Sequence, residues 1–210
     1  MSSLTVIRNG MITLGEIPEH FTSSILPQET VKHILEKWRN NPMFVPRISK
    51  VTVNISVGGN TERLEKAVKV LRMLTGQEPS IRRAKQTIKE FGISRGQPIA
   101  AVVTLRGVKA VEFLRKALYA INFTLKQNSF DPYGNVAFGI REHILLPGVK
   151  YDPELGIFGM DVALTLERPG FRIIRRRRRK KLSVPRRHRV TPEESMLMLE
   201  LLFGVRIVSK

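Results

Sequence analysis

The sequence predicts an α+β fold, and patterns within residues 47–120 carry that prediction. Residues 49–57 alternate apolar and polar side chains with period two, which indicates a strand buried on one face. Two later stretches, 60–76 and 109–120, place apolar residues at the spacing of an amphipathic helix. With two further strand patterns between these helices, the predicted order is strand, helix, strand, tip, strand, helix.

The strand at 49–57 has an unusual second face. Its apolar face is formed by branched residues, and its other face carries small uncharged hydrogen-bonding groups, Thr52, Asn54 and Ser56. Solvent-facing strand positions commonly carry Lys or Glu, so these groups stand out in a strongly basic chain. Two interpretations stay open at this point. The face is either solvated, or it lies flat against a partner that is rich in donors and acceptors.

Charge and composition narrow the class of partner. The 210 residues include 36 Lys+Arg and 18 Asp+Glu, a formal net charge of +18. Such an excess indicates a polyanionic partner, with nucleic acid first and an anionic membrane surface second. No cysteine is present, which excludes disulfides and thiol catalysis. The start lacks a secretory signal pattern and no apolar run approaches the ~18 residues of a membrane span, so we expect a cytoplasmic protein without a membrane partner.

Other elements follow from local patterns. Residues 1–27 give no clear pattern, whereas 30–40 reads as a helix with Trp38 on its apolar side, ended by Asn40-Asn41-Pro42. Asn60 is expected to cap the next helix, and Gly76 to end it in the left-handed conformation. Its expected apolar stripe consists of Leu64, Ala67, Val68, Leu71 and Leu74. The remaining strands are expected at 79–84, 99–105, 136–146 and 160–167.

A basic segment lies near the C-terminus. Residues 172–189 hold 11 positive charges and no acid, among them Arg175, Arg176, Arg177, Arg178, Arg179, Arg186 and Arg187. Adjacent cations cannot pack as core. The segment leads into Thr191-Pro192-Glu193-Glu194, which predicts a capping box and a helix ending at Gly204. A basic loop held at both ends, which orders on a partner, is therefore favoured over a free tail.

The tip between the strands at 79–84 and 99–105 is also basic. Arg82, Arg83, Lys85, Lys89 and Arg95 stand against the single acid Glu90. A solvated hairpin and a phosphate-binding tip are both compatible with this pattern, and the second basic segment favours the latter. Aromatic residues make up only 7% and do not cluster on a strand, so shape and phosphate recognition of structured RNA is favoured over base stacking.

Signals for catalysis are weak. Gly58-Gly59 precedes a predicted helix but lacks the Lys-Ser/Thr of a phosphate-binding loop. The four histidines, at 20, 33, 143 and 188, are not spaced like metal ligands. Glu142 and His143 fall in a strand pattern, which would direct their side chains to opposite faces. Asp152, Glu154 and Asp161 lie near glycines, where turn roles are expected. We predict no catalytic residues, no metal and no cofactor.

Several motifs together resemble one family. They occur in the order Asn54-Ile-Ser-Val-Gly58, Leu74-Thr-Gly-Gln77, Arg83-Ala-Lys85, Phe91-Gly-Ile-Ser-Arg-Gly-Gln-Pro98, Val103-Thr-Leu-Arg106, Asn128-Ser-Phe-Asp131, Gly139-Ile-Arg-Glu-His143 and Gly159-Met-Asp161. This ordered set resembles the universal large-subunit ribosomal protein that binds 5S ribosomal RNA. The ending Leu166-Glu-Arg-Pro-Gly170 and the Arg/Lys loop look like its archaeal and eukaryotic branch. The resemblance covers residues from Asn41 to the C-terminus.

The resemblance implies a structural ribosomal protein of the cytoplasm. Its expected fold is an antiparallel sheet with helices packed on one face, basic loops and a C-terminal helix. The sheet face would hold 5S RNA in the central protuberance, with Asn54, Gln77 and Thr104 as uncharged recognition groups. The tip carrying Arg83, Lys85, Lys89 and Arg95 resembles the loop that approaches the peptidyl-site transfer RNA. Large-subunit ribosomal RNA, neighbouring ribosomal proteins and a small-subunit protein are the other implied partners.

Three departures from the family pattern concern RNA contacts. Ser56 stands where Gly is frequent, Gln86 where a second Lys is common, and Pro132-Tyr133 replaces a usual Gly-Arg. The expected organisation is one domain: an N-terminal extension and helix (1–46), an α+β RNA-binding core (47–170), a basic loop (171–190) and a C-terminal helix packing on the core (191–210). The alternatives are an RNA-modifying enzyme, another basic RNA-binding protein, and a polybasic membrane-surface protein. The basic segment lacks the large apolar residues of an interfacial helix.

Overall fold

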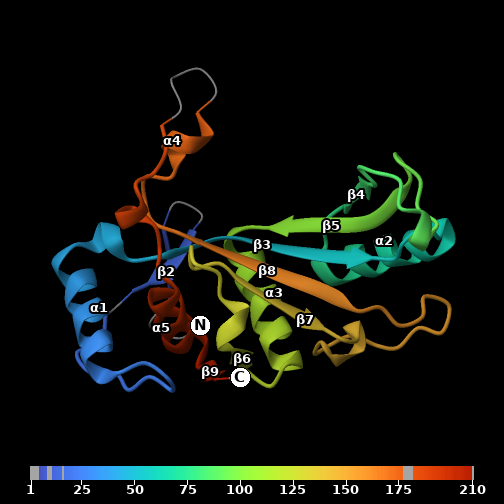
Figure 1. Ribbon diagram of the computed structural model, residues 1–210. Coiled ribbons are helices and arrows are strands. Elements are labelled where there is room, and N and C mark those ends of the chain that lie inside the picture. Colours follow the sequence, from blue (N-terminus) through green and yellow to red (C-terminus); the bar gives the residue numbers. More distant parts are fainter. Residues whose placement is uncertain (1–4, 9–10, 16, 177–181, 210) are drawn as a thin grey trace.

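A computed structural model describes residues 5–8, 11–15, 17–176 and 182–209, and its centre is an antiparallel sheet (Figure 1). Strand β3 (Arg47–Ser56) lies in the middle. It pairs with β5 (Pro98–Leu105) along one edge and with β8 (Met160–Glu167) along the other. The period-two pattern at 49–57 therefore belongs to a central strand, and the α+β prediction is confirmed.

Shorter strands extend the sheet on both sides. Strand β4 (Ser80–Arg83) pairs with β5, and β7 (Val136–Ile140) pairs with β8. The hairpin of β1 (Thr5–Arg8) and β2 (Met11–Leu14) joins β3 through Ile12, opposite Ile48. No sequence pattern predicted this hairpin, because four-residue strands are too short to show a period.

Two amphipathic helices cover the apolar face of the sheet. Helix α2 (Thr61–Thr75) begins at Asn60, whose Oδ1 accepts from the Arg63 N–H at 3.0 Å, and ends at Gly76 with φ of 60°. Helix α3 (Gly107–Ala120) follows β5 directly. Val70 belongs to the buried side of α2, whereas Val68 and Leu74, which were expected there, are only half-buried. The buried stripe of α2 therefore differs from the predicted one at these three positions.

A second group of elements packs at the end of the sheet where β3 begins (Figure 1). Helices α1 (Gln28–Asn40) and α5 (Pro192–Phe203) lie there, and Trp38 is fully buried, as predicted. The predicted capping box is present, with Thr191 and Glu194 bonded reciprocally. Strand β6 (Thr124–Lys126) pairs in parallel with β9 (Arg206–Val208), which fixes the chain after α5.

The strand expected at 136–146 is wrong beyond Ile140. The chain instead makes a 3-10 turn, η4 (His143–Leu145), which leaves His143 buried and Glu142 exposed. Leu146 is buried in the core while the neighbouring Leu145 is exposed. The apolar residues at 144–146 therefore form part of a turn and do not pair with another strand. The other 3-10 turns are η1 (Pro42–Phe44), η2 (Lys89–Phe91), η3 (Gln127–Ser129) and η5 (Arg186–His188).

Candidate nucleic-acid interface

The face of the sheet opposite α2 and α3 is open. On β3, Val51, Val53 and Ile55 are buried against the helices, at 0–1% exposure. Side chains alternate along a strand, so Thr52, Asn54 and Ser56 point the other way. Thr52 and Asn54 are half-buried and Ser56 is exposed. The predicted polar face therefore points away from the interior.

Small side chains surround this polar row. Residues directly opposite in an antiparallel ladder project to the same side of the sheet. By register, the neighbours of the row on β5, β8 and β7 are Ala100, Val102, Thr104, Asp161, Ala163, Ala137 and Gly139. We call this surface, together with Thr52, Asn54 and Ser56, the open face. Because most of its side chains are short, it is shallow enough for a flat partner to approach the strands.

The hydrogen bonds of Asn54 leave part of its amide free. Its Nδ2 donates to Ser56 Oγ at 3.2 Å and to Asp161 Oδ2 at 3.4 Å. No residue in the described part of the chain donates to Asn54 Oδ1. Asp161 lies in β8, so the expected turn role is wrong for this residue, although Asp152 does accept from the Glu154 N–H in a turn.

The charge at the centre of the open face determines what can lie on it. The Asp161 carboxylate would repel a phosphate there, but it accepts hydrogen bonds from amino groups of bases or from ribose 2′-hydroxyls. Lys50 and Arg82 project to the same side, beside Thr165 and Ala100 respectively, towards the two ends of the face. This arrangement suits sugar and base edges at the centre and phosphates at the periphery.

The two other uncharged candidates lie differently. Thr104 is exposed and directly opposite Thr52, so it extends the polar row onto β5. Gln77 is half-buried in the turn after α2, where its N–H donates to Thr75 Oγ1 at 3.4 Å. It lies outside the paired strands, three residues before β4 begins.

The basic tip is an ordered extension of the β4–β5 pair. Backbone hydrogen bonds join Ala84 N to Gln97 O at 2.8 Å and Ile88 N to Ile93 O at 2.8 Å. Gln97 Nε2 also donates to Gly59 O at 3.0 Å, which ties the tip to the turn after β3. The cations Arg83, Lys85, Lys89 and Arg95 are all exposed, and none forms an ion pair with another described residue. Their charge is available to a polyanion.

The basic loop begins at the opposite end of the sheet (Figure 1). Arg175 ends the short helix α4 (Arg172–Arg175) and pairs with Glu167, and Arg176 is half-buried. Arg186 and Arg187 are exposed in η5. The predicted contacts at Arg177, Arg178 and Arg179 fall outside the described residues.

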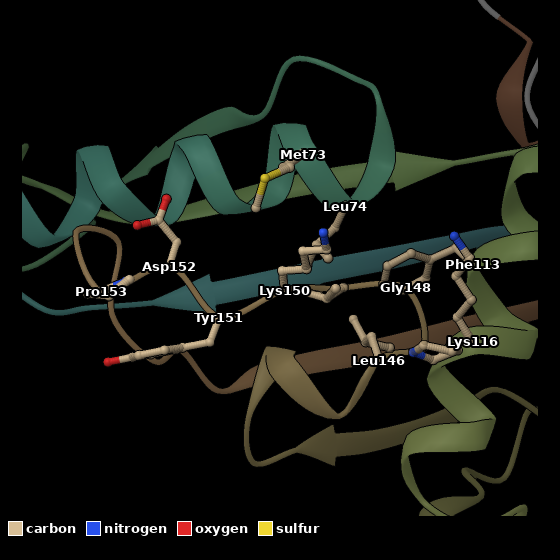
Figure 2. A pocket seen from close by; sticks show the side chains of 12 residues that line it. Met73, Leu74, Phe113, Lys116, Leu146, Gly148, Lys150, Tyr151, Asp152 and Pro153 are labelled. Atoms are coloured by element: carbon tan, nitrogen blue, oxygen red, sulfur yellow. The ribbon is translucent and has the colours of Figure 1, made fainter.

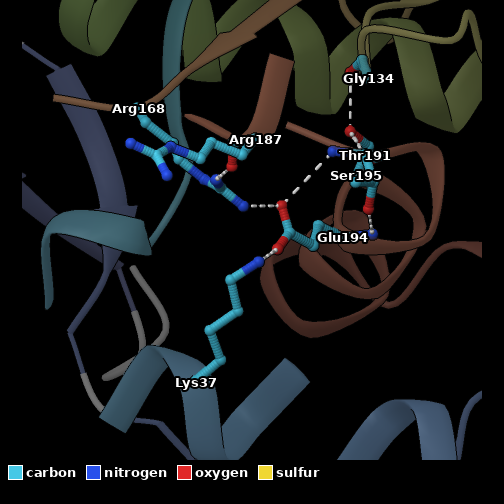
Figure 3. Close-up of polar contacts among 7 residues, drawn as sticks. All are labelled: Lys37, Gly134, Arg168, Arg187, Thr191, Glu194 and Ser195. Atoms are coloured by element: carbon cyan, nitrogen blue, oxygen red, sulfur yellow. Dashed lines mark hydrogen bonds and ion pairs between the residues drawn. The ribbon is translucent and has the colours of Figure 1, made fainter. Parts of the chain in front are cut away.

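A buried ion cluster holds the base of this loop (Figure 3). The Glu194 carboxylate, 2% exposed, pairs with the fully buried Arg168 guanidinium and, at 2.8 Å, with Lys37 Nζ. Arg168 Nη1 also donates to Arg187 O at 3.3 Å, and its guanidinium lies 5.0 Å from the centre of the Phe44 ring. One carboxylate thus joins α1, the end of β8, the basic loop and α5.

His188 adds a second attachment at the same place. Its Nε2 lies 2.8 Å from Pro169 O, and its ring stands between those of Phe44 and Phe171, with centroids 6.1 and 6.2 Å away. The two ends of the loop are therefore fastened together. Sequence reasoning missed this clamp because Arg168, His188 and Phe44 are distant in the chain and show no motif.

A cleft on the helix side of the sheet shows no catalytic arrangement among the residues described (Figure 2). It is lined mainly by apolar side chains of α2, α3 and the loop at 146–153, with Lys116 and Lys150 beside them. Across the described ranges, no group of three His, Cys, Asp or Glu side chains could hold a metal ion. The same part of the chain contains no helix long and apolar enough to cross a membrane.

A shallow face of mostly uncharged groups, with cationic segments at both ends of the sheet, is typical of an RNA-binding protein. Comparison with known proteins agrees with that class: residues 41–93 match the family described as ribosomal protein L5, and residues 98–197 match the model of the C-terminus of that ribosomal family. The chain belongs to the ribosomal protein L5 family. It is a structural protein of the large ribosomal subunit, of the archaeal type, found on the cytoplasmic ribosome, and it is not an enzyme.

Individual relatives support this membership. Large ribosomal subunit protein uL5 of Aeropyrum pernix is 57% identical over 183 residues, which cover 87% of this chain and 95% of the relative. The proteins of the same name from Sulfurisphaera tokodaii and Methanococcus aeolicus are 59% and 45% identical. These alignments cover 80% and 82% of this chain, and 95% and 96% of the respective relatives.

Proposed function

We propose that the protein holds 5S ribosomal RNA against the open face, in the central protuberance of the large subunit. Support comes from the uncharged row of Thr52, Asn54 and Ser56, which points away from the core and continues onto Thr104. Hydrogen-bonding groups on a shallow surface suit the wide minor groove of folded RNA, where 2′-hydroxyls are displayed. The outward direction of this row is the observation that carries the proposal.

The cationic segments at the two ends supply attraction without sequence preference. Arg186 and Arg187 of the basic loop, and the predicted Arg175–Arg179 run, would neutralise phosphates of 5S or large-subunit ribosomal RNA. Gln77 would contact RNA beside β4. Neighbouring ribosomal proteins, including a small-subunit protein across the interface, complete the proposed partners.

The tip would approach the peptidyl-site transfer RNA. Its four exposed cations stand at the end of the sheet away from the basic loop, so one molecule can contact two different RNA segments at once. The hydrogen bond from Gln97 to Gly59 would keep the tip in a fixed direction relative to β3.

A competition experiment tests the central claim. The full chain is mixed with 5S ribosomal RNA and with unrelated duplexes of equal length at ~200 mM salt, where phosphate attraction is weakened. We expect preferential binding of 5S RNA. Equal affinity for all the RNAs would contradict the proposal and favour a general basic RNA-binding protein.

A further inference from the structure

A groove lies where the open face meets the basic loop. It has a volume of about 320 Å³ and is lined by the turn before β7, the end of β8 and both ends of the basic loop. This size is at the small end of the ~300–1,000 Å³ range of ligand sites. The lining residues that matter here are Tyr133, Asn135, Thr165, Phe171, Arg175 and Arg189.

The walls of the groove offer flat surfaces. Tyr133 is 51% exposed, and the Arg189 guanidinium carbon lies 4.7 Å from the centre of its ring. Phe171, from the other end of the loop, is half-buried beside His188. Aromatic rings and guanidinium planes are the surfaces on which nucleobases stack. The fold thus brings together two aromatic residues that are far apart in the sequence.

Polar groups with free hydrogen-bonding capacity line the same groove. Asn135 Nδ2 donates to Asp131 Oδ2 at 2.6 Å, but within the described chain neither Asn135 Oδ1 nor the Thr165 hydroxyl has a hydrogen-bond partner. Arg189 has no carboxylate partner in that part of the chain either. The groove therefore combines a stacking surface, acceptors for a base edge and a cation that can face an anionic ligand.

The groove is preorganised. Asp131 Oδ1 accepts from the Tyr133 N–H at 2.9 Å, and Ser195 Oγ of α5 donates to Gly134 O at 2.7 Å. Arg189 follows His188, which is fixed at Pro169. Groups held in place before binding lose little conformational entropy when a ligand arrives.

The groove is also continuous with the open face. Val136 pairs with Leu164, so Asn135 and Thr165 come next along the same two strands. Thr165 lies beside Lys50 of β3, and the following residue on that side of β8 is Ala163, opposite Thr52. An RNA held on the open face would reach the groove without a break in the surface.

We propose that this groove takes one unpaired nucleobase of the RNA that lies on the open face. The base stacks on the Tyr133–Arg189 pair, Asn135 and Thr165 contact its edge, and the Arg189 charge faces an adjoining phosphate. Arg175, which lines the same groove, already pairs with Glu167. Arg189 brings a guanidinium from the basic loop to the turn that holds Tyr133. The inference rests on the proposed binding of 5S RNA to the open face.

The test uses the full chain and 5S ribosomal RNA, with affinity measured across a series of salt concentrations. Tyr133→Ala removes the stacking surface, and we expect affinity to fall by roughly 5- to 150-fold, the equivalent of about 1–3 kcal/mol for one stacked base. The slope of affinity against salt should not change, because no phosphate contact is lost. Tyr133→Phe, which keeps the ring, should bind like the wild type.

Controls separate this claim from its alternatives. Tyr133→Leu keeps apolar bulk without an aromatic face and should behave like Tyr133→Ala; wild-type affinity for either variant would overturn the proposal. Arg189→Gln removes a phosphate contact and should lower the salt slope by about one unit. If Tyr133→Ala lowered the slope by the same amount, Tyr133 would only position Arg189, and the stacking proposal would be overturned. If the proposed function were wrong, the wild-type protein itself would bind 5S RNA no more tightly than unrelated duplexes of equal length. Unfolding midpoints of each variant confirm that the fold is intact.

Discussion

Asn54 on β3 and Asp161 on β8 face each other across the open face, with Asn54 Nδ2 donating to Asp161 Oδ2 at 3.4 Å. The pair places an amide oxygen and a carboxylate at the centre of a surface whose ends are cationic. In the proposed complex, charge selects where the RNA backbone runs, and the uncharged groups contact the sugar and base edges between the cationic ends.

Replacing Asn54 tests the recognition role. Asn54→Ala should weaken 5S RNA binding by up to about tenfold, the equivalent of a net hydrogen bond of ~0.5–1.5 kcal/mol. The salt dependence of binding should stay the same, because no phosphate contact is removed. Gln28→Ala, an exposed amide at the start of α1, serves as the matched control. An unchanged affinity for Asn54→Ala would argue against recognition at this position.

The exposed arginines of η5 should act on any RNA. The double variant Arg186→Gln/Arg187→Gln should lower affinity for 5S and unrelated RNA alike, and reduce the salt slope by up to about two units. Only side chains change, so the Arg187 carbonyl still accepts from Arg168. Lys109→Gln/Lys116→Gln on α3 removes equal charge from the helix side and should leave the slope as it is. Equal slopes for the two double variants would refute a specific role for the loop.

The buried ion cluster around Glu194 predicts which of two variants is the less stable. Glu194→Gln leaves the Arg168 charge buried without a counter-charge and should cost about 3–5 kcal/mol. Arg168→Met should cost less, because Glu194 keeps its pair with Lys37. Urea unfolding monitored by Trp38 fluorescence measures both free energies. The reverse order would show that Arg168 contributes mainly through packing on Phe44.

Alanine substitution at two glycines with similar φ angles distinguishes the cost of backbone strain from the cost of a steric clash with the new Cβ. Gly134 and Gly58 have φ of 75° and 72°, so alanine is strained at both, at about 1–3 kcal/mol. At Gly134 a Cβ would also lie 2.8 Å from Val190 Cγ1 and still closer to Ser195 Oγ, whereas at Gly58 no atom lies within 4 Å. Gly134→Ala should therefore cost ~1–3 kcal/mol more than Gly58→Ala in chemical denaturation. Equal costs would mean that the turn relaxes freely.

His143 makes stability depend on pH. Burial lowers the pKa of His143, and the charge of Glu142 acts in the opposite direction. The Phe158 N–H donates to His143 Nδ1 at 3.3 Å, which favours the neutral ring. The folded state thus binds the proton less readily than the unfolded chain, whose pKa is ~6.5. The contribution of neutral His143 is complete above that pH and is lost as pH falls towards the folded pKa.

We therefore expect the free energy of unfolding to decline more steeply below about pH 6.5 in the wild type than in His143→Gln. Denaturation curves at a series of pH values measure this difference. His33→Gln, on the exposed side of α1, controls for the loss of one histidine. Parallel pH profiles for wild type and His143→Gln would exclude this contribution.

Local patterns predicted the elements that carry strong periodicity or clear caps. The alternation around Val53, the caps at Asn60 and Thr191, and the apolar side of α1 with Trp38 all depend on neighbours within a few residues, so they are visible in the chain itself. The hairpin β1–β2 and the turn at His143 were not predicted, because short strands and apolar turns have no distinguishing period.

The basic charge, the α+β class and the polar strand surface can all be read from the chain alone, because periodicity and charge are local properties. Three contacts depend on the folded arrangement: Asp161 stands beside Asn54, Glu194 pairs with both Arg168 and Lys37, and Arg189 lies over Tyr133. Each of these pairs joins residues from different elements, and their approach depends on strand register and on packing of α5 against the sheet. Such distances are set by the whole core and not by any one segment.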